Sequence, residues 1–558
     1  MEEMKAHLYA VYGAAVDDNY FKLFEDLIDQ TRIDRERNEL WNEKDIFLIT
    51  YGDTFLKEEE IPLKTLHYFL VRHFKNIFST VHILPFFPYS SDDGFAVKDF
   101  YKVNPELGDW SDIQKISNDF RLMADLVVNH ASSQSDWFRQ FLMGEAPGKD
   151  YFFVPEEDFN SRLVVRPRST PLVTNYQSVN GVKRAWTTFS ADQVDLNYHN
   201  PMLLLEVVKI VLWYIKNGAR VIRLDAIAFI WKSSGTPCVH LFETHEIIKL
   251  LRQVIDYCAP DVILITETNV PHLENISYFG RGDEAHMVYQ FPLPPLLLFT
   301  MNMGNAGALT RWASSLSDPG ENRTWFNFTA SHDGIGVRPL EGLVSRAEIN
   351  GMVDNMINFG ALISNRRRSD GTEEPYEINI TYFDAMKGIG NKPDNFQVDR
   401  FLCSQLIMMS LKGVPAFYIH SMFGTPNDYN AAAMQIKNRA INRRKYWLYE
   451  IESLISGRSY QAGVFGSLQH FIKLRKEQTA FHPDAGQEIL DIGMSFFAFI
   501  RSNTETGQHI LCISNITPGE RRIVAVKDIQ HYKYDLLSRQ SIGSQEIVLK
   551  PYQTVWLV

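Results

Sequence analysis

Short runs of β-branched and aromatic residues recur along most of this chain, and segments with helical periodicity separate most of them. Two of the separating segments are Met202–Asn217 and His245–Cys258. Such an alternation favours a parallel sheet, so eight runs predict an α/β fold whose strands close into a (β/α)8 (TIM) barrel, with functional side chains at the C-terminal strand ends. The predicted strands are Ile46–Tyr51, Val81–Phe87, Leu122–Asn129, Arg220–Asp225, Val262–Glu267, Met287–Phe291, Trp325–Ser331 and Val414–Ile419.

Other parts of the chain do not fit the alternation. Two intervals within it are too long for simple connections, and long intervals in a compact protein are usually subdomains or lids. Near the C-terminus, runs such as Phe496–Ile500 and His509–Ile513 are short and set off by turn residues, which predicts antiparallel strands. The expected parts are a helical extension (1–44), the barrel (45–130, 199–333 and 379–481), two insertions (131–198 and 334–378) and a C-terminal antiparallel β domain (482–558).

Composition excludes nucleic-acid binding. The 558 residues are 45% hydrophobic and 22% charged, an ordinary balance for a soluble globular protein. The net charge is −11, and the basic run Arg366–Arg368 is too short for a nucleic-acid surface. We therefore interpret the acidic balance as favouring solubility only.

The sequence also indicates a compartment. The four cysteines are widely spaced without a Cys-x-x-Cys pair, which fits a reducing compartment and argues against a disulfide framework or a zinc site. The N-terminal residues lack the basic and apolar regions of a signal peptide. The most apolar stretch, around Pro292–Met301, is too short and proline-rich to span a bilayer. We expect a cytoplasmic protein without membrane contact.

Polar side chains follow several predicted strands. Asp225 ends one strand with Arg223 two residues before it on the same face, and Glu267 ends the next strand. If these strands are neighbours in a barrel, their acids converge on one pocket. Retaining glycosidases use two carboxyl groups about 5–5.5 Å apart, one as nucleophile and one as acid and base. Asp225 alone is equally compatible with a structural salt bridge to Arg223.

A metal site is the competing interpretation of the clustered acids. Neither His130 nor His332 belongs to a His-x-x-x-His spacing, and Arg223 would repel a cation. We therefore expect neither a metal nor an organic cofactor.

Five short segments together resemble the α-amylase family of retaining α-glycosidases. In chain order they are Asp125 with Asn129–His130, Gln193–Asn197 with Asn200–Pro201, Gly218–Ala226, Glu267, and His332–Asp333. The resemblance implies a catalytic barrel in which the two insertions are the family's B and B′ subdomains. Five motifs in this order on the predicted strands are far more specific than any one of them.

Within that family, the chain is most similar to the sucrose phosphorylase branch. The segments that carry this likeness are His82–Phe87, Asp92–Phe95, Arg166–Arg168, Glu377–Tyr382, Gly413–Ile419 and Asn438–Arg443, where Ala440 departs from the acid of the branch. Further stretches resemble the glucosylglycerate phosphorylases of that branch: Trp231–Leu241, Glu267–His272, Asp283–Phe291 and Ala330–Gly336.

The resemblance implies a role for each matched residue. Asp225 would be the nucleophile, Glu267 the general acid and base, and Asp333 the residue that stabilises the transition state. Asp125 would support the site through a hydrogen-bond network. The glucose-binding residues would be Asp92, His130, Arg223, His332 and Arg439, with Asp92 and Arg439 at the closed end of the pocket. On the acceptor side, Arg168 and Tyr382 would position phosphate and a glycerate-type anion, with Lys232 or the Arg366–Arg368 run helping. For that run, solvated surface charge is the favoured interpretation.

The expected reaction is phosphorolysis of 2-O-α-D-glucosyl-D-glycerate to α-D-glucose 1-phosphate and D-glycerate, with net retention. The alternatives are phosphorolysis of sucrose, sucrose 6-phosphate or glucosylglycerol, and hydrolysis by an α-glucosidase. A non-catalytic barrel used as a binding subunit is the alternative from another class. The expected partners are thus a small α-glucoside, phosphate and a glycerate-type acceptor, and the branch favours a homodimer.

Overall fold

Eight parallel strands close into a barrel, as the alternation predicted. The computed structural model describes residues 1–33, 39–367, 372–435, 437–524, 531–542 and 546–558. Each barrel strand overlaps one predicted run, and neighbours follow the order β1-β18-β12-β11-β10-β9-β4-β3. Their bounds are β1 Phe47–Thr50, β3 Thr80–Ile83, β4 Arg121–Val127, β9 Ala219–Asp225, β10 Ile263–Thr266, β11 Met287–Tyr289, β12 Thr324–Phe328 and β18 Val414–Tyr418.

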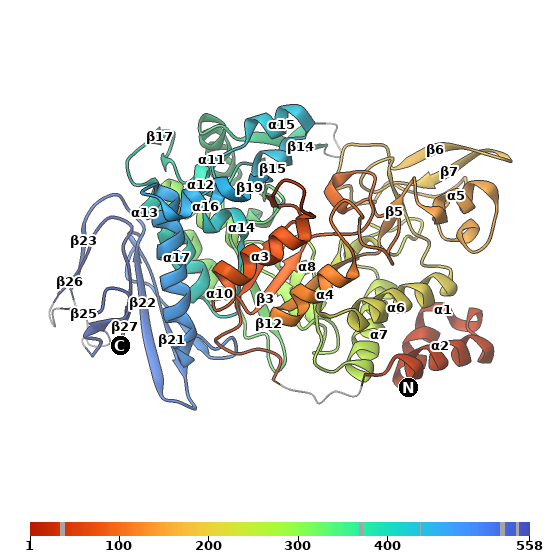
Figure 1. The fold of residues 1–558 in the computed structure, drawn as a ribbon, viewed down its shortest axis with the longest axis horizontal. Coiled ribbons are helices and arrows are strands. Elements are labelled where there is room, and N and C mark those ends of the chain that lie inside the picture. The colour runs from red at the N-terminus through yellow and green to blue at the C-terminus, as the bar shows by residue number, and fades with distance from the viewer. Residues whose placement is uncertain (34–38, 368–371, 436, 525–530, 543–545) are drawn as a thin grey trace.

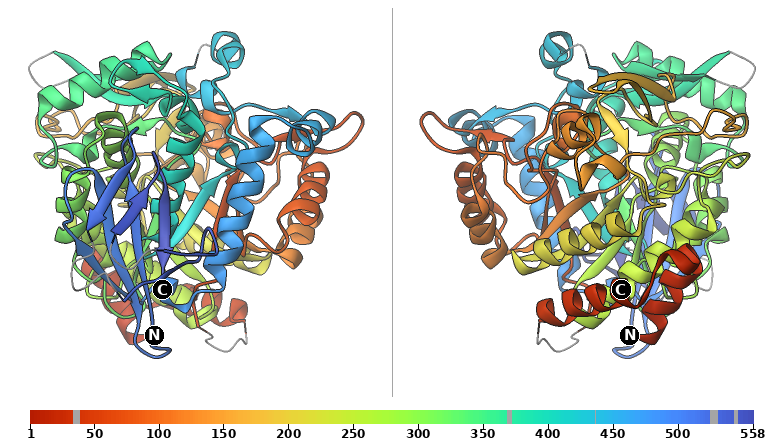
Figure 2. Two further views of the ribbon diagram at one scale, coloured as in Figure 1. Left: turned by 90° about the vertical axis from the view of Figure 1, so that its left-hand side faces the viewer. Right: turned by 90° about the vertical axis from the view of Figure 1, so that its right-hand side faces the viewer.

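Helices surround the barrel and cover the outer face of its strands (Figures 1 and 2). This covering explains why nearly every strand residue is buried and why the runs are continuously apolar. The helix α6 starts where the Asn200 side chain accepts a hydrogen bond from the Met202 N–H and Pro201 occupies the first turn. The larger helices are α3 Pro62–Phe74, α4 Trp110–Asp119, α6 Pro201–Lys216, α7 Phe242–Cys258, α9 Leu293–Met303, α10 Gly307–Ser315, α13 Gln397–Ser410, α16 Leu448–Ser456 and α17 Tyr460–Lys476.

The segment after β4 forms a small subdomain above one side of the barrel (Figure 1). Its strand β5 (His130–Ser132) pairs antiparallel with β8 (Gln193–Asp195), which sets His130 opposite Asp195. The remaining elements are the helix α5 (Asp136–Met143) and the hairpin β6 (Val173–Ser178) with β7 (Gly181–Trp186).

The segment after β12 forms a three-stranded antiparallel sheet in the order β13-β15-β14. Its elements are β13 Ile335–Gly336, η6 Arg338–Leu340, α11 Arg346–Asn358, β14 Leu362–Arg367 and β15 Glu373–Asn379. Arg366 lies in this sheet, whereas Arg368 of the predicted basic run lies outside the described residues.

The short elements complete the chain on either side of these parts. The helices α1 (Glu2–Tyr12) and α2 (Asp18–Thr31) lie near α7, where the Ile33 N–H donates to the Cys258 carbonyl at 2.8 Å (Figure 1). The others are η1 Gly13–Ala15, β2 Phe55–Leu56, η2 Asp92–Gly94, η3 Gly148–Asp150, η4 Ile227–Phe229, α8 His272–Ile276, η5 Ser277–Phe279, α12 Tyr382–Ala385, β16 Gly388–Ile389, β17 Lys392–Pro393, α14 Ile419–Met422, α15 Tyr429–Gln435, η7 Asn438–Asn442, β19 Tyr446–Trp447 and η8 Thr479–Phe481.

The C-terminal part is an antiparallel sheet beside the barrel, as predicted (Figure 2, left). Its strands follow the order β20-β21-β22-β27-β24-β25, and β23 pairs separately with β26. The bounds are β20 Gly486–Leu490, β21 Phe496–Asn503, β22 Gln508–Asn515, β23 Arg521–Val524, β24 Tyr534–Asp535, β25 Gln540–Ser541, β26 Glu546–Leu549 and β27 Thr554–Leu557. In the described parts of the chain, no helix combines the length and apolarity that a bilayer crossing requires.

Candidate active site

Arg223 lies between two carboxylates at the C-terminal end of the barrel. The parallel register of β4 and β9 sets Asp125 opposite Arg223, and Asp225 follows on the same strand face. Nη1 of Arg223 donates to Oδ1 of Asp225 at 2.8 Å and also to Oδ1 of Asp125. Nε2 of His82 lies 2.7 Å from the other Asp125 oxygen. Asp125 is therefore a buried support that holds Arg223 against Asp225.

Two opposing effects act on Asp225. Burial raises its pKa above the usual range of an aspartate, and the positive charge of Arg223 lowers it. Burial also raises the pKa of Asp125, but the charges of His82 and Arg223 outweigh that effect and lower this pKa to about 2. The arginine thus favours the ionised form of both side chains.

Glu267 stands directly after β10, next to the strand that ends in Asp225. Its backbone N–H donates to the Leu224 carbonyl at 3.0 Å, which continues the pairing of the two strands. Ala226 adopts φ 49°, a conformation uncommon outside glycine, and its N–H lies 3.3 Å from Oε2 of Glu267. Burial raises the pKa of Glu267, and Arg223, whose Nη2 is 3.8 Å from the carboxylate, opposes the rise. A carboxyl group in this environment can stay protonated and act as an acid.

Asp333 is held by arginines from another part of the chain. Nη1 of Arg439 contacts Oδ1 of Asp333 at 2.5 Å, and Nη2 of the same arginine lies 2.8 Å from Oε1 of Glu377. Burial alone would raise the pKa of Asp333, but Arg439 and Arg443 lower it below its usual range. Asp333 is therefore an anion in this site.

The turn before Phe95 brings a further acid to the same place. Asp92 and Asp93 have φ values of 54° and 50°, so two consecutive non-glycine residues are left-handed there. Nε2 of Gln193 lies 3.3 Å from Oδ2 of Asp92 and 3.2 Å from Nε2 of His130. The β5–β8 pairing thus links Asp92 to His130 through one amide.

Two histidines contribute neutral imidazoles. Burial lowers the pKa of both His130 and His332. The His332 ring stacks on Phe95 with centroids 4.8 Å apart and an interplanar angle of 5°. A neutral imidazole can donate one hydrogen bond and accept another, which suits the recognition of sugar hydroxyls.

These side chains line one cavity, which we call the acidic cavity. The predicted residues that line it are Asp92, His130, Arg168, Asp225, Glu267, His332, Asp333 and Arg439. Within the described parts of the chain, no group of three or more His, Cys, Asp and Glu side chains is placed to hold a metal ion. The positive charges among the acids come from arginines.

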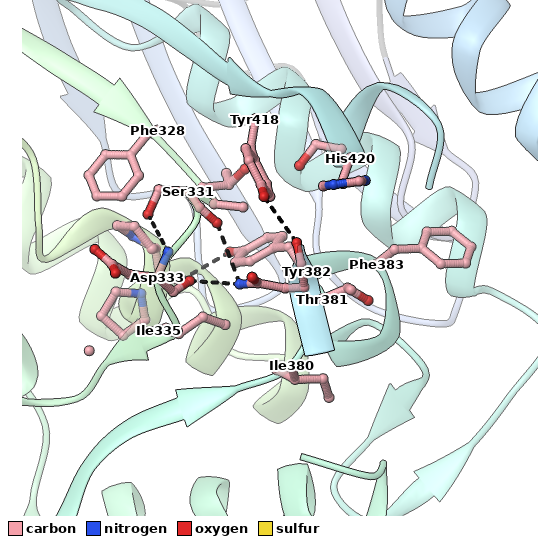
Figure 3. A pocket seen from close by; sticks show the side chains of 18 of the residues that line it. Phe328, Ser331, Asp333, Ile335, Ile380, Thr381, Tyr382, Phe383, Tyr418 and His420 are labelled. Atoms are coloured by element: carbon pink, nitrogen blue, oxygen red, sulfur yellow. Dashed lines mark hydrogen bonds between the residues drawn. The ribbon is translucent and has the colours of Figure 1, made fainter. Parts of the chain in front are cut away.

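Tyr382 lies in a neighbouring cavity and not in the acidic cavity (Figure 3). Its hydroxyl donates to the Pro294 carbonyl at 3.0 Å. Asp333 is shared by both cavities. On the acidic side, the Arg168 guanidinium lies over the ring of Tyr376, 5.6 Å from its centroid. Tyr376 therefore occupies the place beside Arg168 for which the resemblance had suggested Tyr382.

Lys232 and Arg366 form ion pairs with carboxylates that do not line the acidic cavity. Lys232 is buried, 2.7 Å from Oδ2 of Asp195 and 3.2 Å from Oδ1 of Asn129, and does not line the acidic cavity. Nη2 of Arg366 lies 2.7 Å from both Glu341 and Glu374. These pairs leave neither cation free for a bound anion in this structure.

Among the residues that line or support the acidic cavity, four polar ones received no role from the sequence: Asn269, Arg338, Tyr376 and Glu377. Asn269 could have been found, because it stands two residues after Glu267 at a strand end. Tyr376 and Glu377 lie in β15 and Arg338 starts η6 just after β13, and the pairing of these strands brings residues 335–337 next to residues 376–378.

Comparison with known proteins agrees with this geometry. The profile of the α-amylase catalytic domain matches residues 74–333. Glucosylglycerate phosphorylase from Allomeiothermus silvanus is 44% identical over 93% of this chain and 92% of its own length. The protein of that name from Escherichia coli K12 is 41% identical over the full length of both chains.

A solved structure has the same fold. The crystal structure of sucrose 6F-phosphate phosphorylase from Thermoanaerobacter thermosaccharolyticum superposes with a TM-score of 0.74 at 25% identity, covering 85% of this chain and 94% of that one. The motifs, the barrel and the full-length relatives lead to one assignment. This chain belongs to the α-amylase family, within the group of the glucosylglycerate phosphorylases.

Proposed function

We propose that this protein is a glucosylglycerate phosphorylase, a hexosyltransferase that converts 2-O-α-D-glucosyl-D-glycerate and phosphate into α-D-glucose 1-phosphate and D-glycerate. The observation that carries this proposal is identity of 41% and 44% to glucosylglycerate phosphorylases over 100% and 93% of the chain. The site supports it, since the acid-lined cavity has the groups that a double displacement at a glucosyl carbon needs.

In the first half-reaction, the Asp225 carboxylate attacks the anomeric carbon and forms a β-glucosyl ester. The bond between that carbon and O2 of glycerate breaks, and the Glu267 carboxyl proton moves to the departing oxygen. Arg223 at 2.8 Å favours the anionic form of Asp225 against the effect of burial and orients the carboxylate, as a nucleophile requires. Asp333, held anionic by Arg439, stabilises the positive charge that develops on the sugar.

In the second half-reaction, a phosphate oxygen attacks the same carbon from the face that glycerate has left. The ester bond to Asp225 breaks, and Glu267, now ionised, accepts the proton of the attacking phosphate hydroxyl. Two inversions at one carbon give the α-phosphate, so the configuration is retained. No other reactant is required.

We assign the two sides of the cavity to the two parts of the substrate. Asp92, His130, His332 and Arg439 would hold the glucosyl hydroxyls, supported by the hydrogen bonds of Gln193. Arg168 with Tyr376 would receive phosphate, because the guanidinium has no hydrogen bond or ion pair to another described residue and can give charge-assisted bonds to an anion.

The test is made in the synthetic direction. The protein is incubated with α-D-glucose 1-phosphate and, in separate reactions, D-glycerate, fructose, fructose 6-phosphate, glycerol or water alone, and phosphate release is followed. We expect release that depends on D-glycerate. Equal release with water alone would identify a hydrolase, and preference for another acceptor would identify a different phosphorylase. No release with any acceptor would contradict an enzymatic role.

We further propose a cytoplasmic location, supported by four cysteines that are all buried and unpaired. The homodimer stays a prediction, which analytical ultracentrifugation of the purified protein would test.

A further inference from the structure

The arginines around the acidic cavity differ in how well their charges are compensated. Arg223 is paired with Asp125 and Asp225, and Arg439 with Asp333 and Glu377. Arg338 lines the cavity, as Arg439 does and Arg223 does not, but its one ion-pair contact to a described residue is long, 3.8 Å from Nη2 to Oε2 of Glu274. Its positive charge is therefore available to a ligand.

The Arg338 side chain is mostly buried without being neutralised. Its side chain is 17% exposed, and its Nε–H is shielded from solvent without a hydrogen-bond partner among the described residues. The Glu274 carboxylate is 43% exposed and also pairs with Nε2 of His240 at 3.2 Å. A contact of 3.8 Å to such a carboxylate is too long for a hydrogen bond and contributes little. A ligand carboxylate could make the shorter contacts that Glu274 does not.

Arg338 lies on the side of the cavity where Glu267 acts. Gly336, two residues before Arg338, packs so closely on Asn269 that a Cβ there would lie 2.8 Å from the Asn269 amide nitrogen. Asn269 stands two residues after Glu267. The Val337 N–H donates to the Tyr376 carbonyl at 3.1 Å, which joins this segment to the tyrosine beside Arg168. Arg338 thus belongs to the leaving-group side.

We infer that Arg338 binds the carboxylate of the glycerate acceptor, an inference that rests on the proposed function. In glucosylglycerate, the carboxylate is attached to the carbon that carries the glycosidic oxygen, so it must lie near Glu267 whenever that residue protonates the oxygen. A negative charge placed beside Glu267, Asp225 and Asp333 is repelled unless a cation meets it. The planar guanidinium of Arg338 meets this need with two parallel N–H donors.

The experiment measures how the glucosyl-enzyme divides between acceptors. The full-length protein and its Arg338→Gln variant are given α-D-glucose 1-phosphate with D-glycerate, and glucosylglycerate and glucose are quantified by chromatography. Both products come from the same ester, so their ratio is independent of the first half-reaction and of the amount of active protein. We expect the ratio to fall about 10- to 100-fold, as for the loss of a charge-assisted hydrogen bond.

Two variants and a second acceptor complete the design. Arg338→Lys keeps the charge but not the paired donors, so we expect a smaller fall of at least about threefold. Arg346→Gln removes an exposed arginine of the same insertion, paired with Glu374, and should leave the ratio unchanged. With glycerol, which lacks the carboxylate, Arg338→Gln should lower the ratio of glucosylglycerol to glucose far less.

The outcomes separate this inference from the proposed function. If the unmodified protein makes glucosylglycerate and both Arg338 variants keep its product ratio, the inference is wrong and the function stands. An equal fall with glycerate and glycerol would also overturn the inference, because the effect would not depend on the carboxylate. If the unmodified protein makes no glucosylglycerate, the proposed function fails and the inference with it.

Discussion

Nζ of Lys232 lies 2.7 Å from Oδ2 of Asp195 at the end of β8, and both side chains are buried. Asp195 also accepts hydrogen bonds from the Thr188 N–H at 2.8 Å and from the Thr188 hydroxyl at 2.7 Å. A buried pair with every partner satisfied fixes geometry. We therefore interpret Lys232 as the residue that fastens the first insertion to the segment after Asp225.

The first prediction concerns this pair. Lys232→Met leaves the Asp195 carboxylate buried without a cation, so we expect the free energy of unfolding to fall by about 3 kcal/mol. Denaturant unfolding followed by tryptophan fluorescence measures this. A second change, Asp195→Asn, removes the orphaned charge and should restore part of the loss. A large rise in the KM for phosphate at unchanged stability would instead favour a direct role in anion binding.

The nucleophile assignment predicts loss of both half-reactions in Asp225→Asn. An amide cannot form the glucosyl ester, so exchange of labelled phosphate into α-D-glucose 1-phosphate should drop by about 10⁴-fold. Asp136→Asn is the matched control, because that aspartate is 83% exposed in the B subdomain. A protein that acts by binding alone would show no exchange before or after the change.

The acid role proposed for Glu267 predicts the pH dependence of phosphorolysis. Its proton is needed for glycerate to leave, and burial raises its pKa, so activity should persist above the usual titration range of a glutamate and fall once the pH rises through the raised pKa. Glu267→Gln should remove this alkaline limb and lower the rate about 10²- to 10⁴-fold. With α-D-glucosyl fluoride, whose leaving group needs no proton, ester formation should be much less affected. An equal loss with both donors would argue against the acid role.

Arg168 predicts the phosphate site. Arg168→Gln removes charge-assisted hydrogen bonds, so the KM for phosphate should rise about 10- to 100-fold. Arg166→Gln provides the control two residues away, since Arg166 is exposed and its guanidinium donates to the Thr170 carbonyl. Initial rates over a range of phosphate concentrations give the KM for phosphate of each variant. A similar rise in the two variants would indicate a general electrostatic effect of the loop.

The positions of the barrel strands, and the face on which each of their side chains lies, could be predicted well because they follow from the local sequence pattern. Continuous apolar runs identified all eight strands, since a parallel strand is covered on both faces. The two-residue spacing placed Arg223 and Asp225 on one face, and neighbouring strand ends brought Glu267 beside them. These relations depend only on strand geometry and on the order of strands in a closed barrel.

The acceptor side was decided by the tertiary structure. Tyr376 lies beside Arg168 from the strand β15, which pairs with β13 so that Gly336 is opposite Glu377, whereas Tyr382 starts the helix α12 outside this sheet. A shift of one residue would turn the opposite set of side chains toward the cavity. Arg338 follows β13 directly, so the same pairing places it at the cavity. Lys232 does not line the cavity and pairs with the buried Asp195 instead. The sequence by itself determined the barrel and the convergence of Asp225 and Glu267 at its C-terminal end, whereas contacts between distant segments, which no local pattern encodes, decided which arginines line the cavity.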